Sequence, residues 1–180
     1  MGQLESRTIL TPPTPLPTSG DWFILHTRSR QEKVVFADLM AMGIGVFLPL
    51  FEEVKRYGRR KIARQKPMFP CYLFLRGTLD DTYRIDRTDR LARIIPVADQ
   101  RKLEWELVNL HLAITRQAPL DPYPFLKVGI RAEVRSGPFR GLQGVIERRD
   151  AKDRILLQVD MLGRAMSLEL DGAILEPVDR

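Results

Sequence analysis

A proline-rich stretch divides the sequence into two parts with different patterns. Pro119, Pro122 and Pro124 lie within six residues. Because proline fixes φ and lacks a backbone N–H, such a stretch favours an extended, semi-rigid connection over a helix or a central strand. We therefore interpret residues 118–125 as a linker between two domains. A chain of 180 residues is long enough for two small domains.

The first twenty residues are also rich in proline and show no repeating apolar pattern. Four prolines fall within six residues, at Pro12, Pro13, Pro15 and Pro17. We expect residues 1–20 to form a disordered leader. A charged n-region followed by an apolar h-region is absent, so the leader is not typical of a signal peptide. No apolar run approaches the roughly 20 residues that span a membrane, and we expect a cytoplasmic protein without membrane contact.

Short apolar runs and helical repeats alternate over residues 21–117, which predicts an α/β sandwich with an antiparallel sheet and flanking helices. Ser29 followed by Glu32 is typical of a capping box and predicts a helix that ends at Gly43. Asp99 is a candidate N-cap for a longer helix. The other expected elements are strands at 22–25, 46–49, 70–75 and 91–95, a hairpin over 52–66 with its turn at Gly58, and a short helix over 80–88.

The longer helix carries one continuous apolar stripe, which predicts a single buried face. The residues of this stripe are Leu103, Leu107, Leu110 and Ile114. Trp105 and Leu112 lie off the stripe, so this pattern does not account for them.

Residues 126–180 show short alternating runs separated by glycines instead of a helical period. The expected strands are 130–135, 145–148, 155–161 and 165–170. Short strands at this spacing predict a small antiparallel barrel. The whole chain is thus expected to belong to the α+β class, with an N-terminal sandwich, a linker and a C-terminal barrel.

The positive charge is concentrated in one segment. The chain has a net charge of +6. Residues 119–180 contain ten basic and ten acidic residues, so the excess lies in the first domain. Residues 54–66 contain no acidic residue. The cations of this basic finger are Lys55, Arg56, Arg59, Arg60, Lys61, Arg64 and Lys66.

Seven cations on one hairpin favour contact with nucleic-acid phosphates, because a polyanion relieves their mutual repulsion and releases counterions. Tyr57 is the only aromatic residue in the finger, so base stacking is not indicated. Arg84 and Arg87 form a second, weaker cluster on the short helix. The alternative for this cluster is charge pairing with neighbouring aspartates, and the alternative for the finger is a solvated loop.

The sequence lacks the patterns of common catalytic and metal sites. Cys71 is the only cysteine, so no internal disulfide can form. His26 and His111 have no second cysteine or histidine nearby, and we expect no metal ion and no cofactor. Phosphate loops, G-x-S-x-G and H-E-x-x-H motifs are also missing. We expect the protein not to be an enzyme.

Two segments resemble the NusG family of transcription factors. Residues 66–75, Lys-Pro-Met-Phe-Pro-Cys-Tyr-Leu-Phe-Leu, resemble the F-P-G-Y strand of NusG N-terminal domains, including RfaH-like paralogues. Residues 135–145, Arg-Ser-Gly-Pro-Phe-Arg-Gly-Leu-Gln-Gly-Val, are similar to a KOW motif, which forms a five-stranded barrel. The resemblance covers residues 21–178 and matches the expected order of domains. Cys71 replaces the usual glycine, which favours a specialised paralogue.

The resemblance implies a transcription elongation or antitermination factor that acts as a monomer. Its first domain would bind the clamp helices of RNA polymerase and reduce pausing or termination, with non-template DNA as a further contact. Its KOW barrel would recruit a NusE-type ribosomal protein or Rho. The implied polymerase-binding residues are Phe69, Pro70, Tyr72 and Phe74. The implied partner-binding residues of the barrel are Phe139, Leu142 and Leu162.

Two alternatives remain open at this point. The aromatic residues of either motif can serve core packing instead of partner binding. The chain can also be a ribosome- or RNA-associated KOW protein. The zero net charge of residues 119–180 disfavours this second function, because RNA-binding barrels are expected to be basic.

Overall fold

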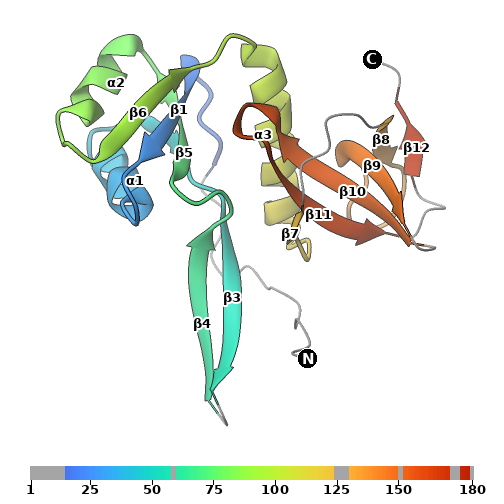
Figure 1. Cartoon of the computed structure of the whole chain (residues 1–180). Helices are drawn as coiled ribbons and strands as arrows, with labels where there is room; N and C mark the ends of the chain where they lie inside the picture. The colour runs from blue at the N-terminus through green and yellow to red at the C-terminus, as the bar shows by residue number, and fades with distance from the viewer. Residues whose placement is uncertain (1–14, 58–59, 124–129, 150–151, 171–174, 179–180) are drawn as a thin grey trace. The chain divides into compact units, whose positions relative to one another are not determined.

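The computed structural model describes residues 15–57, 60–123, 130–149, 152–170 and 175–178 (Figure 1). The chain divides into two compact units. We call Pro13–Leu50 with Gln65–Glu104 the sheet unit. The barrel unit consists of the described residues of Phe51–Arg64 and Trp105–Arg180. Among the described residues, no helix is long and apolar enough to cross a membrane.

The sheet unit contains a four-stranded antiparallel sheet with the order β2-β5-β1-β6. Its strands are β1 (Asp21–Thr27), β2 (Gly45–Phe47), β5 (Tyr72–Gly77) and β6 (Leu91–Pro96). In the register of β1 and β5, His26 is the partner of Tyr72, and Ile24 is the partner of Phe74. Strand β2 pairs with β5 only from Phe47, opposite Phe74, to Gly45, so Tyr72 lies beyond the end of β2.

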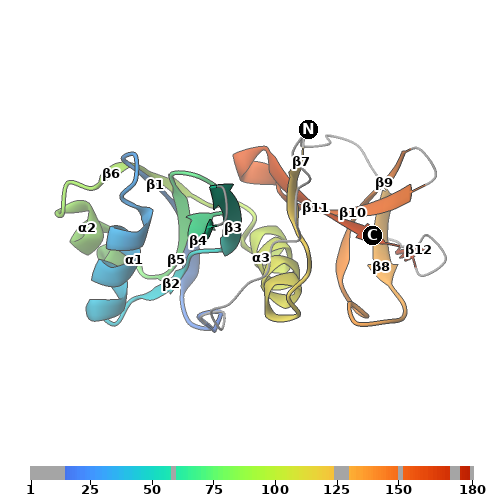
Figure 2. The same cartoon turned by 90° about the horizontal axis from the view of Figure 1, so that it is seen from below.

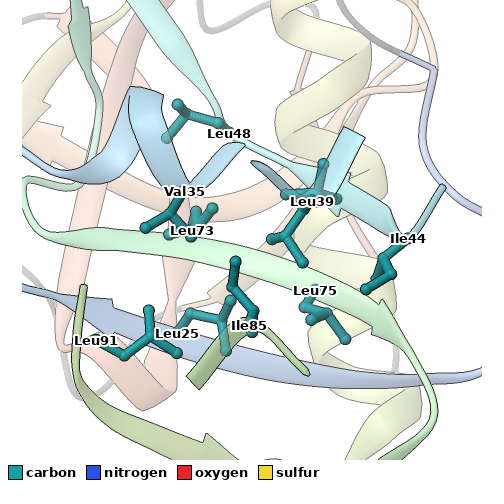
Figure 3. Close-up of a cluster of buried hydrophobic side chains, with 10 residues drawn as sticks. Leu25, Val35, Leu39, Ile44, Leu48, Leu73, Leu75, Ile85 and Leu91 are labelled. Atoms are coloured by element: carbon teal, nitrogen blue, oxygen red, sulfur yellow. The ribbon is translucent and has the colours of Figure 1, made fainter. Parts of the chain in front are cut away.

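One face of this sheet is covered by helices α1 (Glu32–Ala41) and α2 (Leu79–Asp86), as Figure 2 shows. Apolar side chains of both helices and of the sheet form one buried cluster (Figure 3). Its members include Leu25, Val35, Leu39, Leu73, Leu75 and Ile85. The alternation along β5 places Leu73 and Leu75 in this cluster, and therefore directs Tyr72 and Phe74 to the other face.

The start of α1 differs from the sequence-based expectation. Ser29 does not cap the helix. The N-cap is Gln31, without a side-chain hydrogen bond, because Arg30 adopts a positive φ of 63° that turns the chain before the helix begins. Glu32 does not complete a capping box, and its carboxylate instead accepts a hydrogen bond from the Cys71 backbone N–H at 2.7 Å.

Helix α2 has a capping box that the sequence analysis missed. The Thr78 side chain accepts from the Asp81 N–H, and the Asp81 carboxylate accepts from the Thr78 N–H. These hydrogen bonds with Thr78, more than the nearby Arg84, lower the pKa of Asp81. The spacing Thr-x-x-Asp is typical of a capping box, so this helix start could have been predicted from the sequence.

Helix α3 (Gln100–Thr115) begins as expected, with Asp99 Oδ1 accepting from the Lys102 N–H at 3.0 Å. All four stripe residues of α3 are buried. The first turn is fixed within the sheet unit. Gln100 bonds both the N–H and the carbonyl of Trp22, and Glu104 pairs with Arg76 at 2.7 Å. From Trp105 onward the helix belongs to the barrel unit.

Part of the expected leader is ordered. Arg76 donates hydrogen bonds to the carbonyl oxygens of Pro17 at 3.0 Å and Gly20 at 3.1 Å. A Cβ on Gly20 would lie 2.6 Å from the Gly77 Cα, so only glycine allows this close crossing. The expectation of disorder is therefore wrong for residues 15–20, because β5 holds them. Residues 1–14 lie outside the described part of the chain.

The expected basic hairpin is present as β3 (Leu50–Tyr57) and β4 (Arg60–Pro67), which form their own two-stranded sheet. The expected turn at Gly58 lies outside the described residues.

The C-terminal part forms an antiparallel sheet with the order β12-β8-β9-β10-β11-β7. Its strands are β7 (Asp121–Tyr123), β8 (Ile130–Val134), β9 (Gln143–Arg149), β10 (Lys152–Val159), β11 (Arg164–Leu170) and β12 (Leu175–Pro177), with a 3₁₀ turn at Asp160–Leu162. Residues 121–123, expected in the linker, add a sixth strand beside β11. The mixed fold with a small KOW-like β domain confirms the expected fold class.

Candidate interaction surface at the end of strands β1 and β5

A tight turn at Phe69–Tyr72 leads into β5. The Tyr72 N–H donates to the Phe69 carbonyl at 3.0 Å, and Cys71 has a φ of 67°. Proline at the second position and a positive φ at the third are the signature of a type II β-turn. The Cys71 N–H bonds to Glu32 of α1, and the Cys71 carbonyl accepts from the Thr27 N–H at 2.8 Å. The turn is thus held rigidly by two neighbouring elements.

Cys71 occupies a backbone conformation that favours glycine, so we predict that Cys71→Gly is more stable than Cys71→Ala by about 1 kcal/mol. Both variants lose the thiol, and only glycine relieves the positive φ. Urea unfolding of the two variants measures the difference. Equal stabilities would show that residue 71 is not strained.

Tyr72 and His26 form the centre of the candidate surface. Their rings stack with centroids 4.7 Å apart and planes inclined by 15°. Both side chains are half-buried, and Pro70 beside them is exposed. On the other side of β1, the register partner of His26 is Arg93, whose side chain is exposed. We call Pro70, Tyr72, His26 and Arg93 the turn surface.

Two of the implied polymerase-binding residues are corrected by the structure. Phe69 and Phe74 are 1% and 0% exposed, so neither ring can meet a partner in this structure. Phe74 packs edge-on against Phe69 and also against Phe47, each with centroids 6.3 Å apart. Both rings therefore pack in the core, which was the alternative considered for these residues.

The sequence analysis did not select His26 or Arg93. Both lie on strands that are distant in sequence from Tyr72, and only the pairing of the sheet brings them together. Strand alternation places His26 on the same face as Trp22 and Ile24, and this pattern could have identified His26 from the sequence.

The basic finger is described only in part. Lys61, Arg64 and Lys66 have exposed side chains. The side chains of Lys55, Arg56, Arg59 and Arg60 lie outside the described part of the structure. The finger therefore remains a candidate nucleic-acid contact on the basis of its sequence and of the three exposed cations.

The second basic cluster is partly paired within its own helix. Arg84 forms a salt bridge with Asp81 at 3.2 Å, as the pairing alternative expected, while its side chain remains half exposed. Arg87 is exposed at the C-cap of α2. Of these two residues, Arg87 is the better candidate for phosphate contact.

The implied partner surface of the barrel is also smaller than expected. Leu142 is 0% exposed, which corrects its assignment as a partner contact, because its side chain belongs to the core of the barrel unit. Phe139 and Leu162 are half-buried and keep some accessible surface. Within the described residues, no group of three or more His, Cys, Asp or Glu side chains could hold a metal ion.

Comparison with known proteins places this chain among transcription factors. The family "NusG: Transcription termination factor nusG" matches residues 20–107. "Transcription termination/antitermination protein NusG" of Rickettsia prowazekii is 24% identical over 172 residues, covering 83% of this chain and 86% of the relative. The chain is thus similar to NusG proteins over most of its length. NusG of Deinococcus radiodurans is 24% identical over 186 residues, which cover 85% of this chain and 96% of that relative.

Among solved structures, this NusG-type chain is similar to a structure of Thermotoga maritima NusG with a TM-score of 0.46 and 20% identity, covering 88% of this chain and 97% of that chain. The sequence relatives extend well beyond residue 107, so the likeness includes the barrel. The protein is thus a NusG-type transcription factor.

Proposed function

We propose that this NusG-type factor binds the clamp helices of RNA polymerase through its turn surface and thereby reduces pausing or termination. The observation that carries the proposal is the rigid placement of Tyr72. A stacked, half-exposed aromatic ring beside an exposed proline offers contact area at little cost in conformational entropy. A hydrogen bond from the Cys71 N–H to the Glu32 carboxylate and one from the Thr27 N–H to the Cys71 carbonyl fix the turn in advance of binding.

Binding alone does not alter elongation. A factor shifts polymerase toward the elongating state only if it binds that state more tightly than the paused state. A rigid surface suits this task, because it fits one arrangement of the clamp helices better than another. In this proposal the barrel of the factor recruits a NusE-type ribosomal protein or Rho, with Phe139 and Leu162 as its accessible apolar contacts.

The function is tested by measuring the affinity of the full chain for core RNA polymerase and for single-stranded RNA at physiological salt. The proposal expects saturable binding to polymerase and an increased elongation rate at pause sites. Binding to RNA without retention of polymerase would instead support the RNA-associated KOW protein.

The basic finger supplies a separate contact with non-template DNA in this proposal. Replacing Arg59, Arg60 and Lys61 by alanine is expected to weaken DNA binding and to reduce the slope of log K against log salt by about 2, since each lost phosphate contact removes about 0.7 on single strands. Titrations at several salt concentrations measure this slope.

The matched control for the finger is Arg135→Ala, because Arg135 lies in the barrel and pairs with Glu176 at 2.7 Å. Affinity for polymerase is expected to stay unchanged in both variants. An unchanged salt slope in the finger variant would rule out the finger as a phosphate contact.

A further inference from the structure

The orientation of the peptide group between Pro70 and Cys71 is fixed by one carboxylate. Glu32 is 7% exposed, and its Oε1 accepts a hydrogen bond from the Cys71 N–H at 2.7 Å. The N–H and the C=O of a trans peptide group point in opposite directions. Since the N–H points at the buried Glu32, the Pro70 carbonyl points away from it, on the side where Pro70 is exposed. No donor from the described part of the chain bonds to this carbonyl.

The alternative orientation of this peptide group would give a type I turn. Type I and type II turns differ by a flip of the peptide plane between their second and third residues. Type II requires a positive φ at the third residue, which a side chain with a Cβ disfavours, whereas type I accepts most residues there. Cys71 nevertheless has a φ of 67°. A residue keeps such a conformation only where contacts around it impose it, so the type II turn depends on a contact from outside the turn.

Glu32 supplies this contact, because only the type II orientation directs the Cys71 N–H at helix α1. In the type I orientation the Pro70 carbonyl oxygen would face the Glu32 carboxylate, and two acceptors repel each other. The Cys71 N–H would at the same time lose its partner. A hydrogen bond from an N–H to a carboxylate is roughly twice as strong as one between neutral groups. The carboxylate thus opposes the intrinsic preference of a cysteine for the type I turn.

The second hydrogen bond that holds the turn does not select between the two orientations. The Thr27 N–H donates to the Cys71 carbonyl at 2.8 Å, and this carbonyl belongs to the next peptide group, which stays in place when the first one flips. The start of α1 is itself anchored, because Lys33 donates to the Gln65 carbonyl of β4 at 2.8 Å. Glu32 therefore acts on the turn from a fixed position.

We propose that Glu32 is a positioning residue of the turn surface, which selects the type II turn and thereby presents the Pro70 carbonyl beside Tyr72 as a hydrogen-bond acceptor for the partner. The part that concerns polymerase rests on the proposed function. A carbonyl that is held in its binding orientation before the partner arrives lowers the entropy cost of association. Glu32 is buried and acts only through the turn, without touching the partner.

The turn is tested first without polymerase, in the full chain. Cys71 is the only cysteine, so its reaction with a thiol reagent such as DTNB reports on this turn alone. Glu32→Ala frees the peptide group and is expected to accelerate the reaction roughly tenfold, because the thiol becomes accessible from more conformations. Glu32→Gln removes the same charge but keeps an acceptor oxygen, and is expected to react within about twofold of wild type. Asp38→Ala is the matched control and is expected to react as wild type does, because Asp38 lies on α1 and pairs with Arg90 at 3.2 Å.

A double-mutant cycle then separates positioning from general stability. Affinity for core RNA polymerase is measured for wild type, Glu32→Ala, Cys71→Gly and the double variant. In the cysteine background, Glu32→Ala is expected to weaken binding roughly tenfold, since only the molecules with the type II turn bind. In the glycine background the same substitution is expected to weaken binding less than about threefold, because glycine adopts the positive φ without help from Glu32. Circular dichroism shows whether each chain is folded.

Each result decides one part of the proposal. An unchanged thiol reaction in Glu32→Ala, or an equal acceleration in Glu32→Gln, would overturn the role of the hydrogen bond in the turn. Equal losses of affinity in both backgrounds would overturn positioning as the cause, because general destabilisation does not depend on residue 71. Absence of polymerase binding by all four chains, with the thiol reaction still faster in Glu32→Ala alone, would overturn the polymerase function and leave the role of Glu32 in the turn established.

Discussion

Replacing Phe74 by alanine is expected to lower the free energy of unfolding by about 3–5 kcal/mol. The ring is fully buried and packs against Phe69 and Phe47, so its removal leaves a cavity in addition to the lost burial of apolar surface. Urea unfolding of the full chain, followed by circular dichroism, measures the change.

The matched control for Phe74 is Tyr83→Ala on α2, because Tyr83 is an aromatic residue that is 53% exposed. Its substitution is expected to change stability by less than about 0.5 kcal/mol. A loss below about 1 kcal/mol in Phe74→Ala would contradict the burial of Phe74 and would reopen its assignment as a polymerase contact.

Tyr72→Ala is expected to weaken binding to core RNA polymerase by about 2 kcal/mol, or roughly thirtyfold in Kd. Tyr72 is the aromatic residue of the implied set that keeps accessible surface, and its stack with His26 holds the ring in one position. Tyr72→Phe keeps the ring and is expected to retain most of the affinity. Equilibrium titration of labelled polymerase measures all three chains.

The stability of Tyr72→Ala has to be compared at the same time, because a lost aromatic stack costs about 0.5–1.5 kcal/mol of folding energy. Tyr83→Ala again serves as the control and is expected to bind as wild type does. If Tyr72→Ala remains folded and binds polymerase with unchanged affinity, the turn surface is not the polymerase site.

Local sequence patterns predicted most of the secondary structure. The Leu103 stripe and Asp99 located α3, whereas the strand expected at 70–75 begins only at Tyr72, after a turn that the sequence analysis did not predict. The predicted start of α1 was wrong because the positive φ of Arg30 cannot be inferred from the periodicity of the sequence. Strand β7 was missed because its pairing with β11 outweighs the proline-rich composition that suggested a linker.

The candidate site was only partly predictable. Tyr72 and Phe74 lie on the same side of β5, and a period of two cannot distinguish them. They differ because β2 ends opposite Phe74 and does not reach Tyr72. His26 joined the site only through the pairing of β1 with β5.

By itself, the sequence determined the division into an α/β part and a glycine-punctuated β part, the position of the basic finger, and the position of helix α3. These features depend on backbone dihedrals and short repeats, which are local properties. Only the tertiary structure decided which aromatic rings are buried, that Glu32 forms a hydrogen bond with the Cys71 turn, and that Asn109 forms one with Gln143. Those contacts join residues 39 and 34 positions apart, and their energy comes from groups that meet only after the chain has folded.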